Sequence, residues 1–196
     1  KNVLLVAYTN RAVDEICQAL SSIKSDILNK TIRIGSKYST DEKFHPLLFN
    51  AKITSIHSRK DLITLIDTCN VTVGTLSSII AKHELFKLKK YDIAIIDEAS
   101  QILEPMLVEL LCKVNKFILI GDHKQLPAVV TQSISQTKIE DNSLNKIGII
   151  NTRNSLFERL YSQLIKEDNK ENIGILSKQG RMHKDIMQFI NDHFYD

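Results

Sequence analysis

The sequence predicts an α/β protein built on a doubly wound parallel sheet, with helices covering both faces of the sheet. Short β-branched apolar runs alternate along the chain with segments whose apolar residues have helical spacing. Because these runs are apolar on both faces, they are typical of parallel strands buried between two layers of helices. With 196 residues, 43% of them hydrophobic, the chain is long enough to form such a core.

Six of the apolar runs are expected to form strands, and four helices are expected between or after them. In chain order the predicted strands are Val3–Ala7, Ile32–Ile34, Val71–Val73, Ile93–Ile96, Phe117–Ile120 and Ile173–Leu176. The predicted helices are Ala12–Ile23, Pro105–Val114, Leu156–Ile165 and Lys184–Phe194. Pro105 suits a first helical turn, where its missing N–H group has no acceptor to lose.

Two segments interrupt this alternation, and a third marks a boundary. Residues of about 37–67 are expected to form an insertion between two strands, and the polar segment Thr131–Arg153 is expected to lie on the surface. The charged, turn-like Lys166–Asn172 divides the chain into a first domain, 1–168, and the opening strand and helix of a second, 172–196. Because one strand and one helix cannot bury a core, the second domain is expected to continue beyond this sequence.

Composition limits the classes of function without selecting one. The three cysteines, Cys17, Cys69 and Cys112, are far apart and form no metal-binding spacing, which favours a reducing compartment, the cytoplasm or a eukaryotic nucleus. The net charge of +3 permits a nucleic-acid partner without requiring one. The apolar runs are too short to span a bilayer, so no membrane association is expected.

Two adjacent carboxylates, Asp97 and Glu98, follow the buried run Ile93–Ile96. Ligands of open α/β sheets bind at the carboxyl ends of the strands. In nucleotide hydrolysis an aspartate holds the magnesium that bridges the phosphates, and a neighbouring acid or amide orients the attacking water. Asp97 fits the first role and Glu98 the second. Taken alone, capping of the next helix by Asp97 or Ser100 is the simpler explanation.

A second polar strand end follows about one strand-helix-strand unit later. Gly121 allows a tight turn after Phe117–Ile120, and Asp122 with Gln125 brings an acid and an amide to the same edge of the sheet. An amide there can hydrogen-bond a γ-phosphate or its attacking water. If this element stood alone, Gln125 would be interpreted as a surface loop residue.

Hydroxyl and amide side chains also follow two other predicted strands. Thr9 and Asn10 open a helix whose free N–H groups favour an anion such as a nucleic-acid phosphate, and Arg11 adds a positive charge. An ordinary helix cap at Asn10 explains the same residues. Thr75 and Ser77 occupy a similar strand-to-helix turn, with the same two interpretations.

Two basic features remain. Gln179 and Arg181 follow the last predicted strand, where an arginine from a second domain can neutralise charge on a transferring phosphoryl group; a loop salt bridge is the simpler alternative. The run Lys82–Lys90 is expected to be a solvated face whose lysines could add phosphate contacts.

Six motifs in this order, AYTNRAVDEI, VGTLSS, IIDEASQ, GDHKQLPAVV, SLFERL and QGRMH, resemble superfamily 1 helicases. The most similar branch translocates 5′ to 3′ and includes RNA-surveillance and DNA-replication helicases. The resemblance implies a RecA-like P-loop NTPase fold, ATP and Mg²⁺ as cofactors, and single-stranded DNA or RNA as the partner of a monomeric motor.

The resemblance also implies roles for individual residues. Asp97 would be the magnesium ligand and Glu98 the catalytic base. Gln125 would sense the γ-phosphate, and Arg181 would contact it across the cleft between two domains. The remaining implied contacts are with nucleotide for Asp122, Gln101 and Gln179, and with the single strand for Thr9, Asn10, Arg11, Thr75 and Ser77.

One element of the family pattern does not occur in this sequence. None of the six glycines is followed by lysine, so there is no GxxxxGK[ST] phosphate-binding loop, which the family places ahead of Val3. We therefore expect the chain by itself not to hydrolyse ATP, and expect a longer protein that contains it to be an ATP-dependent helicase. The alternative is a non-catalytic nucleic-acid-binding or interaction module that retains the helicase fold.

Overall fold

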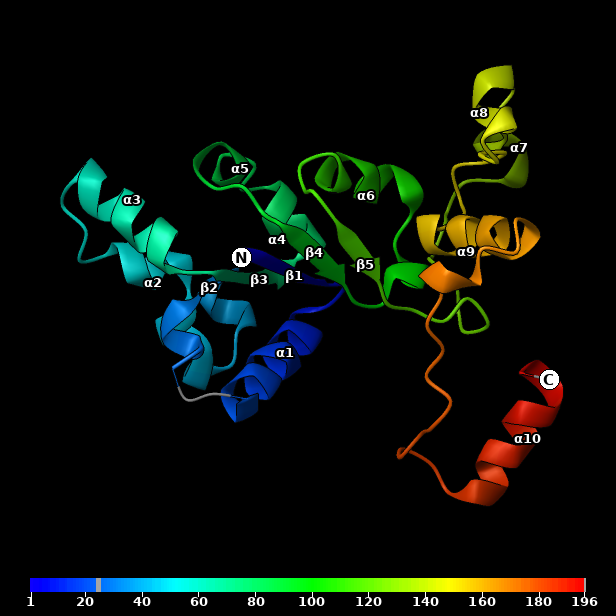
Figure 1. Cartoon of the computed structure of the whole chain (residues 1–196), viewed down its shortest axis with the longest axis horizontal. Helices are drawn as coiled ribbons and strands as arrows, with labels where there is room; N and C mark the ends of the chain where they lie inside the picture. The colour runs from blue at the N-terminus through cyan, green and yellow to red at the C-terminus, as the bar shows by residue number, and fades with distance from the viewer. Residues whose placement is uncertain (24–25, 196) are drawn as a thin grey trace.

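The computed structural model describes residues 1–23 and 26–195, and within them it contains a five-stranded, all-parallel sheet (Figure 1). The strands are β1 (Val3–Ala7), β2 (Thr31–Ile34), β3 (Val71–Thr75), β4 (Ile93–Ile96) and β5 (Phe117–Leu119). Their spatial order is β2-β3-β1-β4-β5, so the chain builds outward on both sides of a central β1. This confirms the predicted α/β class and is consistent with a RecA-like P-loop fold.

Helices connect the strands and cover both faces of the sheet. The α-helices are α1 (Asn10–Ile23), α2 (Phe49–Ile53), α3 (Arg59–Thr68), α4 (Leu76–Ile80), α5 (Leu85–Leu88), α6 (Glu104–Leu111), α7 (Ile134–Thr137), α8 (Asn142–Lys146), α9 (Leu156–Lys166) and α10 (Lys184–Phe194). The 3₁₀-helices are η1 (Leu28–Lys30), η2 (Lys37–Ser39), η3 (Glu42–Leu47), η4 (Ala99–Gln101) and η5 (Lys170–Asn172). Figure 1 shows α1 on one face of the sheet and α4 and α6 on the other. No helix among the described residues is long and apolar enough to cross a membrane.

The core consists of two apolar clusters, one on each face of the sheet. Alternate residues of β1 contribute to different clusters: Leu4 and Val6 pack with the residues of α4 and α6, whereas Ala7 packs with Val13 and Cys17 of α1. This alternation is the period of two that a strand imposes on its side chains. The run Val3–Ala7 is apolar throughout because helices cover both of its faces.

The segment between β2 and β3 contains η2, η3, α2 and α3 and is anchored to α1 by a buried charge. Arg33 on β2 is fully buried, and its Nη1 lies 2.9 Å from a carboxylate oxygen of Asp14 on α1. Its Nε donates a hydrogen bond of 3.0 Å to the hydroxyl of Thr40. The contact between Arg33 and Asp14 is an ion pair without hydrogen-bond geometry, so among the described residues Nε is the one nitrogen of the guanidinium that has a hydrogen-bond partner. The N–H of Asp41, in the same segment, donates to Oδ2 of Asp14 at 3.2 Å, so charge attraction and two hydrogen bonds hold the segment against the first helix.

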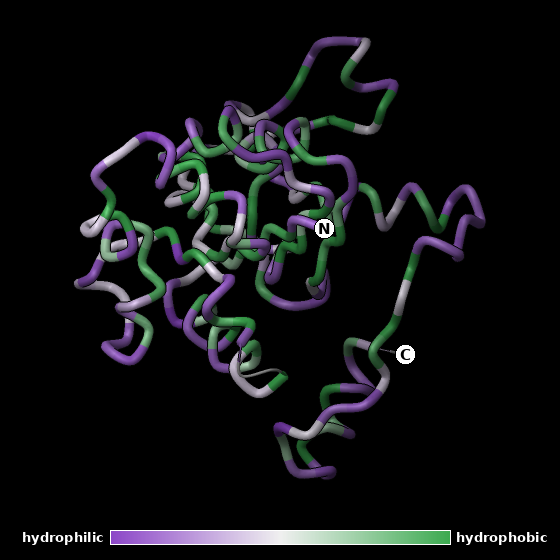
Figure 2. The backbone as a smooth tube through the Cα atoms, turned by 60° about the vertical axis from the view of Figure 1, so that its left-hand side comes forward, coloured by the Kyte–Doolittle hydropathy of each residue, from purple (hydrophilic) through white to green (hydrophobic). Residues whose placement is uncertain are grey.

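The predicted strand Ile173–Leu176 is wrong, because these residues form no strand in the structure. Ile175 is 78% exposed and Leu176 is 93% exposed. A strand requires a neighbour with which to exchange backbone hydrogen bonds, and no described strand lies beside this segment. The chain instead extends away after α9 before it forms α10 (Figure 2). Residue 196, the end of the predicted second domain, lies outside the described residues.

The prediction that Lys82–Lys90 is a solvated face is wrong at Lys89. This side chain is only 7% exposed, and its ammonium donates hydrogen bonds to the carbonyl oxygens of Ile66 (2.6 Å) and Cys69 (2.5 Å) at the end of α3. Burial lowers the pKa of Lys89 below its ordinary value. Lys89 therefore satisfies carbonyl groups that the end of α3 leaves without helical partners.

β5 forms one edge of the sheet, beside β4. Phe117 is 44% exposed and Ile118 is 46% exposed, so both faces of this short strand are partly open. The polar segment that follows it, predicted to lie on the surface, forms the short helices α7 and α8 and is largely exposed.

Candidate nucleotide site at the carboxyl edge of the sheet

β4 ends in the two adjacent carboxylates. The N–H of Asp97 donates to the carbonyl of Val6 on β1 at 2.8 Å, so the hydrogen bonding between β4 and β1 extends to Asp97. Glu98 then adopts a left-handed backbone conformation, with φ 54° and ψ 37°, and its N–H donates to Oδ1 of Asp97 at 3.0 Å. The chain turns sharply here, and both carboxylates remain partly exposed at the edge of the sheet.

Neither Asp97 nor Ser100 caps the helix that follows. α6 begins at Glu104, and its N-cap residue, Leu103, makes no side-chain capping bond. The hydroxyl of Ser100 instead accepts a hydrogen bond from the N–H of Asp122 at 3.3 Å, across to the next strand end. The simpler explanation, capping of this helix by Asp97 or Ser100, is therefore excluded for α6.

Two further contacts join the loops that follow β4 and β5. The N–H of Ala99 donates to the carbonyl of Ile120 at 2.8 Å. A Cβ atom on Gly121 would lie 2.9 Å from the backbone nitrogen of Ser100, closer than real Cβ contacts allow. Glycine is needed at this position because the two loops approach each other so closely.

Polar side chains from both loops hold one another in place. Nε2 of Gln101 donates to Oε2 of Glu98 at 3.1 Å, and Nε2 of Gln125 donates to Oδ2 of Asp122 at 2.9 Å. Oδ1 of Asp122 accepts from the N–H of Lys124 at 2.9 Å. Each acid thus has an amide partner, and the arrangement presents two acid–amide pairs on neighbouring strand ends.

The environment of Asp122 keeps it ionised. Partial burial by itself raises the pKa of this carboxyl, but hydrogen bonds from the hydroxyl of Tyr195, the backbone of Lys124 and the amide of Gln125 outweigh it and lower the pKa below its ordinary value. Asp122 is therefore a carboxylate at neutral pH.

The donor set at this edge suits magnesium held jointly with a nucleotide. Among the described residues, no group of three or more His, Cys, Asp and Glu side chains is placed to hold a metal. Mg²⁺ commonly binds through one or two carboxylates and completes its shell with phosphate oxygens and water. Asp97, partly exposed with Glu98 beside it, fits that kind of site.

The residues considered for nucleic-acid contact lie at the carboxyl ends of β1 and β3. These strands are neighbours, with Ala7 opposite Thr75, so the turns that follow them are adjacent. Thr9, and not Asn10, caps α1: its hydroxyl accepts from the N–H of Ala12 at 3.2 Å. Asn10 is the first residue of the helix.

The side chains in these two turns differ in how accessible they are to a ligand. Arg11 is highly exposed, and its Nε lies 3.3 Å from Oε1 of Glu15, one turn further along α1. Thr75 is the N-cap of α4 and is only 7% exposed; its hydroxyl accepts from the N–H of Ser78 at 3.2 Å. Ser77 is exposed. Thr75 therefore serves the helix start, whereas Arg11 and Ser77 are accessible to a ligand.

Gln179 and Arg181 lie in a separate turn. Oε1 of Gln179 accepts from the N–H groups of Arg181 at 2.8 Å and Met182 at 2.9 Å, and the side chain of Arg181 is exposed. No hydrogen bond or ion pair between described residues connects this turn to Asp97 or Glu98. The structure thus brings together the residues of β4 and β5 but not the arginine.

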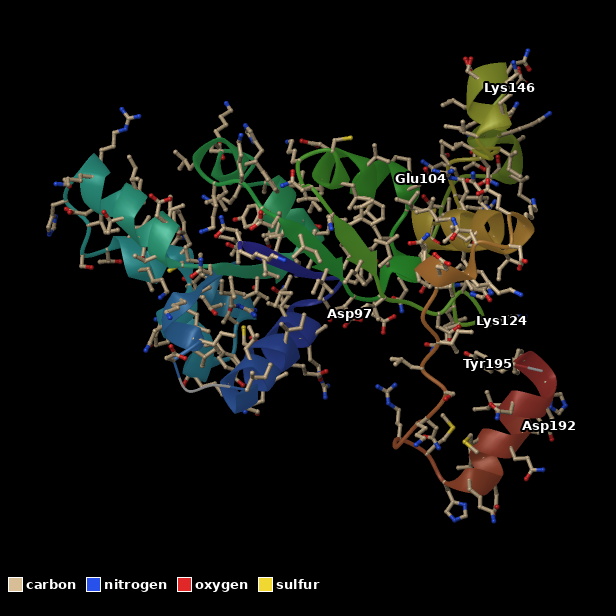
Figure 3. All side chains as sticks on the ribbon, in the orientation of Figure 1. Asp97, Glu104, Lys124, Lys146, Asp192 and Tyr195 are labelled. Carbon is tan, nitrogen blue, oxygen red and sulfur yellow. The ribbon has the colours of Figure 1, made fainter. Side chains whose placement is uncertain are left out.

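Two contacts at this edge were not expected from the sequence. The hydroxyl of Tyr195, from the end of α10, donates to Oδ2 of Asp122, and Figure 3 shows Tyr195 near the loop that carries Lys124. The ring of His123 stacks on Tyr161 of α9, with centroids 4.4 Å apart. Both join residues far apart in the chain, for which no local pattern gives a signal.

Comparisons with known proteins find similarity in the region that contains both acid-bearing loops. A family model described as an AAA domain matches residues 50–133, which include β3, β4, β5 and the two acid-bearing loops. The DNA replication ATP-dependent helicase/nuclease dna2 of Schizosaccharomyces pombe is 33% identical over 196 residues, which cover 100% of this chain and 12% of that protein.

Two further relatives are similar to nearly the whole chain. The DNA replication ATP-dependent helicase/nuclease DNA2 of Homo sapiens is 31% identical over 199 residues, covering 100% of this chain and 16% of the relative. The DNA replication ATP-dependent helicase/nuclease JHS1 of Arabidopsis thaliana is 31% identical over 194 residues, covering 99% and 13%. The chain thus spans only 12% to 16% of the length of these relatives.

Proposed function

We propose, on the premise that this chain is a superfamily 1 helicase sequence, that it holds the magnesium and the attacking water of an ATP-driven motor acting on single-stranded DNA. The similarity to the three relatives covers 99% to 100% of this chain, and these relatives are named as DNA replication ATP-dependent helicase/nucleases. Their names favour DNA over RNA as the substrate. The motor is proposed to act as a monomer.

One observation carries this proposal: the acid pair after β4 and the acid–amide pair after β5 are joined at one edge of the sheet. The bond from the N–H of Asp122 to the hydroxyl of Ser100 connects the two loops, and Gly121 permits the close approach. A nucleotide triphosphate bound at this edge would meet both pairs, as ligands of open α/β sheets do.

Each residue has a defined task in the proposed reaction. Asp97 holds the metal through its carboxylate, and Glu98 accepts the proton of the attacking water. The amide of Gln101, 3.1 Å from Glu98, orients that carboxylate. Bound Mg²⁺ supplies charge neutralisation on the phosphates. Gln125 hydrogen-bonds the γ-phosphate or the water, and Asp122 fixes its amide in place.

We further propose that residues 172–196 belong to a second domain, separate from residues 1–168. Its Arg181 would approach the γ-phosphate when the two domains close on a nucleotide. The exposed side chain of Arg181 and its position beyond α9 support this role. Gln179, which binds the backbone of Arg181, shapes the turn that presents the guanidinium.

The single strand is proposed to pass over the adjacent ends of β1 and β3. Arg11 and Ser77 are accessible there, while Thr9 and Thr75 cap the two helices whose N–H groups would face the phosphates. Asn10, the first residue of α1, would add an amide to the same contact.

The test is ATP turnover by a longer polypeptide that joins this chain to a GxxxxGK[ST] loop. The variant Glu98→Gln is expected to lower kcat by about 100-fold or more, because the water loses its base, while ATP binding persists. Glu109→Gln, which changes an exposed acid on α6, serves as the matched control and leaves kcat unchanged. Equal turnover in the Glu98→Gln variant and the wild type would refute the assignment.

The 196 residues alone are expected to show no turnover, since they contain no phosphate-binding lysine loop. Measurable hydrolysis by this chain that disappears in Glu98→Gln would overturn that expectation. If the longer polypeptide binds single-stranded DNA but never hydrolyses ATP, the chain is instead a non-catalytic binding module.

A further inference from the structure

A basic pocket lies at the amino ends of β4 and β5, opposite the edge that carries Asp97. It has a volume of ≈ 440 Å³ and lies between α5 and residues 112–115. A bridge between Tyr91 and Val114, just ahead of the two strands, places it there. At a rise of about 3.3 Å per residue, β4 separates the pocket from Asp97 by roughly 13 Å. The proposed nucleotide site does not include it.

The floor of the pocket is apolar and held in place. The ring of Tyr91 packs edge-on against that of Phe86, with centroids 5.6 Å apart, and its hydroxyl donates to Thr72 at 2.9 Å. Tyr91 is 2% exposed, so the floor belongs to the core of the protein. The aromatic floor is therefore already formed, and its side chains would lose no further freedom when a ligand binds.

Lysines surround this floor. Lys87 and Lys90 are exposed pocket residues, and no ion pair between described residues engages either ammonium. A third, Lys113, lies 5.3 Å from the centroid of the Phe86 ring and 2.8 Å from Glu109. The two unpaired ammonium groups beside an apolar surface favour a ligand that combines negative charge with an apolar side chain.

The distribution of charge favours a peptide over a nucleic acid. Glu84 and Glu109 flank the lysines and are exposed, with 63% and 56% of their side chains accessible. A nucleic-acid strand carries a phosphate at every step and would meet these carboxylates along its path. A short peptide can place its acids opposite Lys87 and Lys90 and leave the flanking positions uncharged.

We propose that this pocket binds an acidic peptide segment, which places one apolar side chain against Phe86 and carboxylates beside Lys87 and Lys90. The pocket would thus connect the motor to a protein partner at the end of the sheet remote from nucleotide.

Fluorescence anisotropy with a labelled peptide of Asp and Glu residues around a single Leu tests the proposal. Lys90→Glu is expected to weaken binding about 10-fold by charge reversal, and replacing the peptide's Leu with Ser about 5-fold by loss of apolar burial. Lys60→Glu reverses an exposed lysine on α3, outside the pocket, and should leave the affinity unchanged. Equal affinities of the Lys90→Glu and Lys60→Glu variants would overturn the proposal.

A single-stranded oligonucleotide of equal charge distinguishes the two classes of partner. It should not displace the peptide from the wild-type protein. If it does displace the peptide, and if Lys90→Glu also abolishes its own binding, the pocket is a nucleic-acid site and the peptide proposal fails.

Cys112 gives an independent measure of where the peptide binds. This thiol lines the pocket and is exposed, whereas Cys17 and Cys69 are buried. Saturating peptide should slow modification of Cys112 by an anionic disulfide reagent about 10-fold, as expected for a covered site. Cys112→Ser should remove the signal. Peptide binding without protection of Cys112 would place the peptide elsewhere and contradict the proposal.

Discussion

At Glu98 the backbone conformation and the proposed chemistry favour different residues. Its φ of 54° lies in the left-handed region, which costs most residues about 1–2 kcal/mol and which glycine adopts freely. Glu98 nevertheless carries the carboxylate that is proposed to act as the base. Strained backbone positions of this kind concentrate at functional sites, where activity and stability favour different residues.

Glu98→Gly should therefore be more stable than Glu98→Ala, by about 1 kcal/mol. Both variants lose the carboxylate and its bond from Gln101, so the comparison isolates the backbone. Urea denaturation of the two proteins measures the difference. Equal free energies of unfolding would mean that Glu98 is not held in a left-handed conformation in solution.

The lowered pKa of Asp122 makes one contribution to stability depend on pH. Because the folded pKa lies below the ordinary value of 3.8, the contribution is fully present above that value and is lost as the pH falls through the folded pKa. The Tm difference between wild type and Asp122→Asn should thus be constant near neutral pH and shrink below about pH 4. A difference that grows with acidity would contradict the hydrogen bonds to this carboxylate.

Among the elements, α9 is fixed to α6 by one ion pair in addition to the contacts of its apolar face. Nε of Arg159 donates to Oε2 of Glu104 on α6 at 2.8 Å, and Nη1 donates to the carbonyl of Ile147 at 2.9 Å. The side chain of Glu104 is 10% exposed, so it depends on this partner. The pair joins α6, α9 and the segment containing α8 at one point.

Arg159→Leu is expected to destabilise the protein by about 3 kcal/mol, because it leaves the buried carboxylate of Glu104 without a cation. Lys170→Leu removes an exposed partner of Asp168, 3.1 Å away, and should cost about 0.5 kcal/mol or less. Urea denaturation provides both values. If the two variants lose the same free energy, the Arg159 pair is no more important than a surface contact.

The sequence predicts the elements whose signals are local. Five of the predicted strands and the helices α1, α6, α9 and α10 occur, because each has its own periodicity and length. The strand expected at Ile173–Leu176 does not occur, because a strand also needs a neighbour. The position of Asp97, Glu98, Asp122 and Gln125 at one edge follows from strand order, which the alternating pattern implies.

The alternating pattern of strands and helices does not predict contacts between residues that are distant in the sequence. Tyr195 and Asp122 are 73 residues apart, and nothing near either residue indicates the other. Lys89 belongs to a lysine-rich run typical of a solvated face, yet it bonds to carbonyls of α3. Such pairings depend on how elements pack, which a single sequence does not specify.

For the molecule as a whole, the segment after η5 is weakly attached to the sheet. Of the hydrogen bonds between described residues, only that from Tyr195 to Asp122 joins residues 174–195 to the part of the chain before η5. Figures 1 and 2 both show the extended connection that leads to α10. The cooperative unit should therefore be the sheet with its covering helices.

Deletion of residues 173–196 is expected to change Tm by about 2 °C or less, because few contacts are lost. Differential scanning calorimetry of the shortened and the complete chain measures the shift. Loss of the cooperative transition on deletion would show that α10 contributes to the core, contrary to the contacts described above.

The open side of β5 affects how this protein can be stored and concentrated. Free backbone groups along the side of a partly apolar strand can recruit another molecule's strand, and the exposed rings and branched chains of Phe117 and Ile118 would strengthen that attachment. Turbidity and loss of material in concentrated stocks would then originate at this strand, while the rest of the protein stayed folded. Dilute stocks, or the substitution Ile118→Lys, should reduce this association.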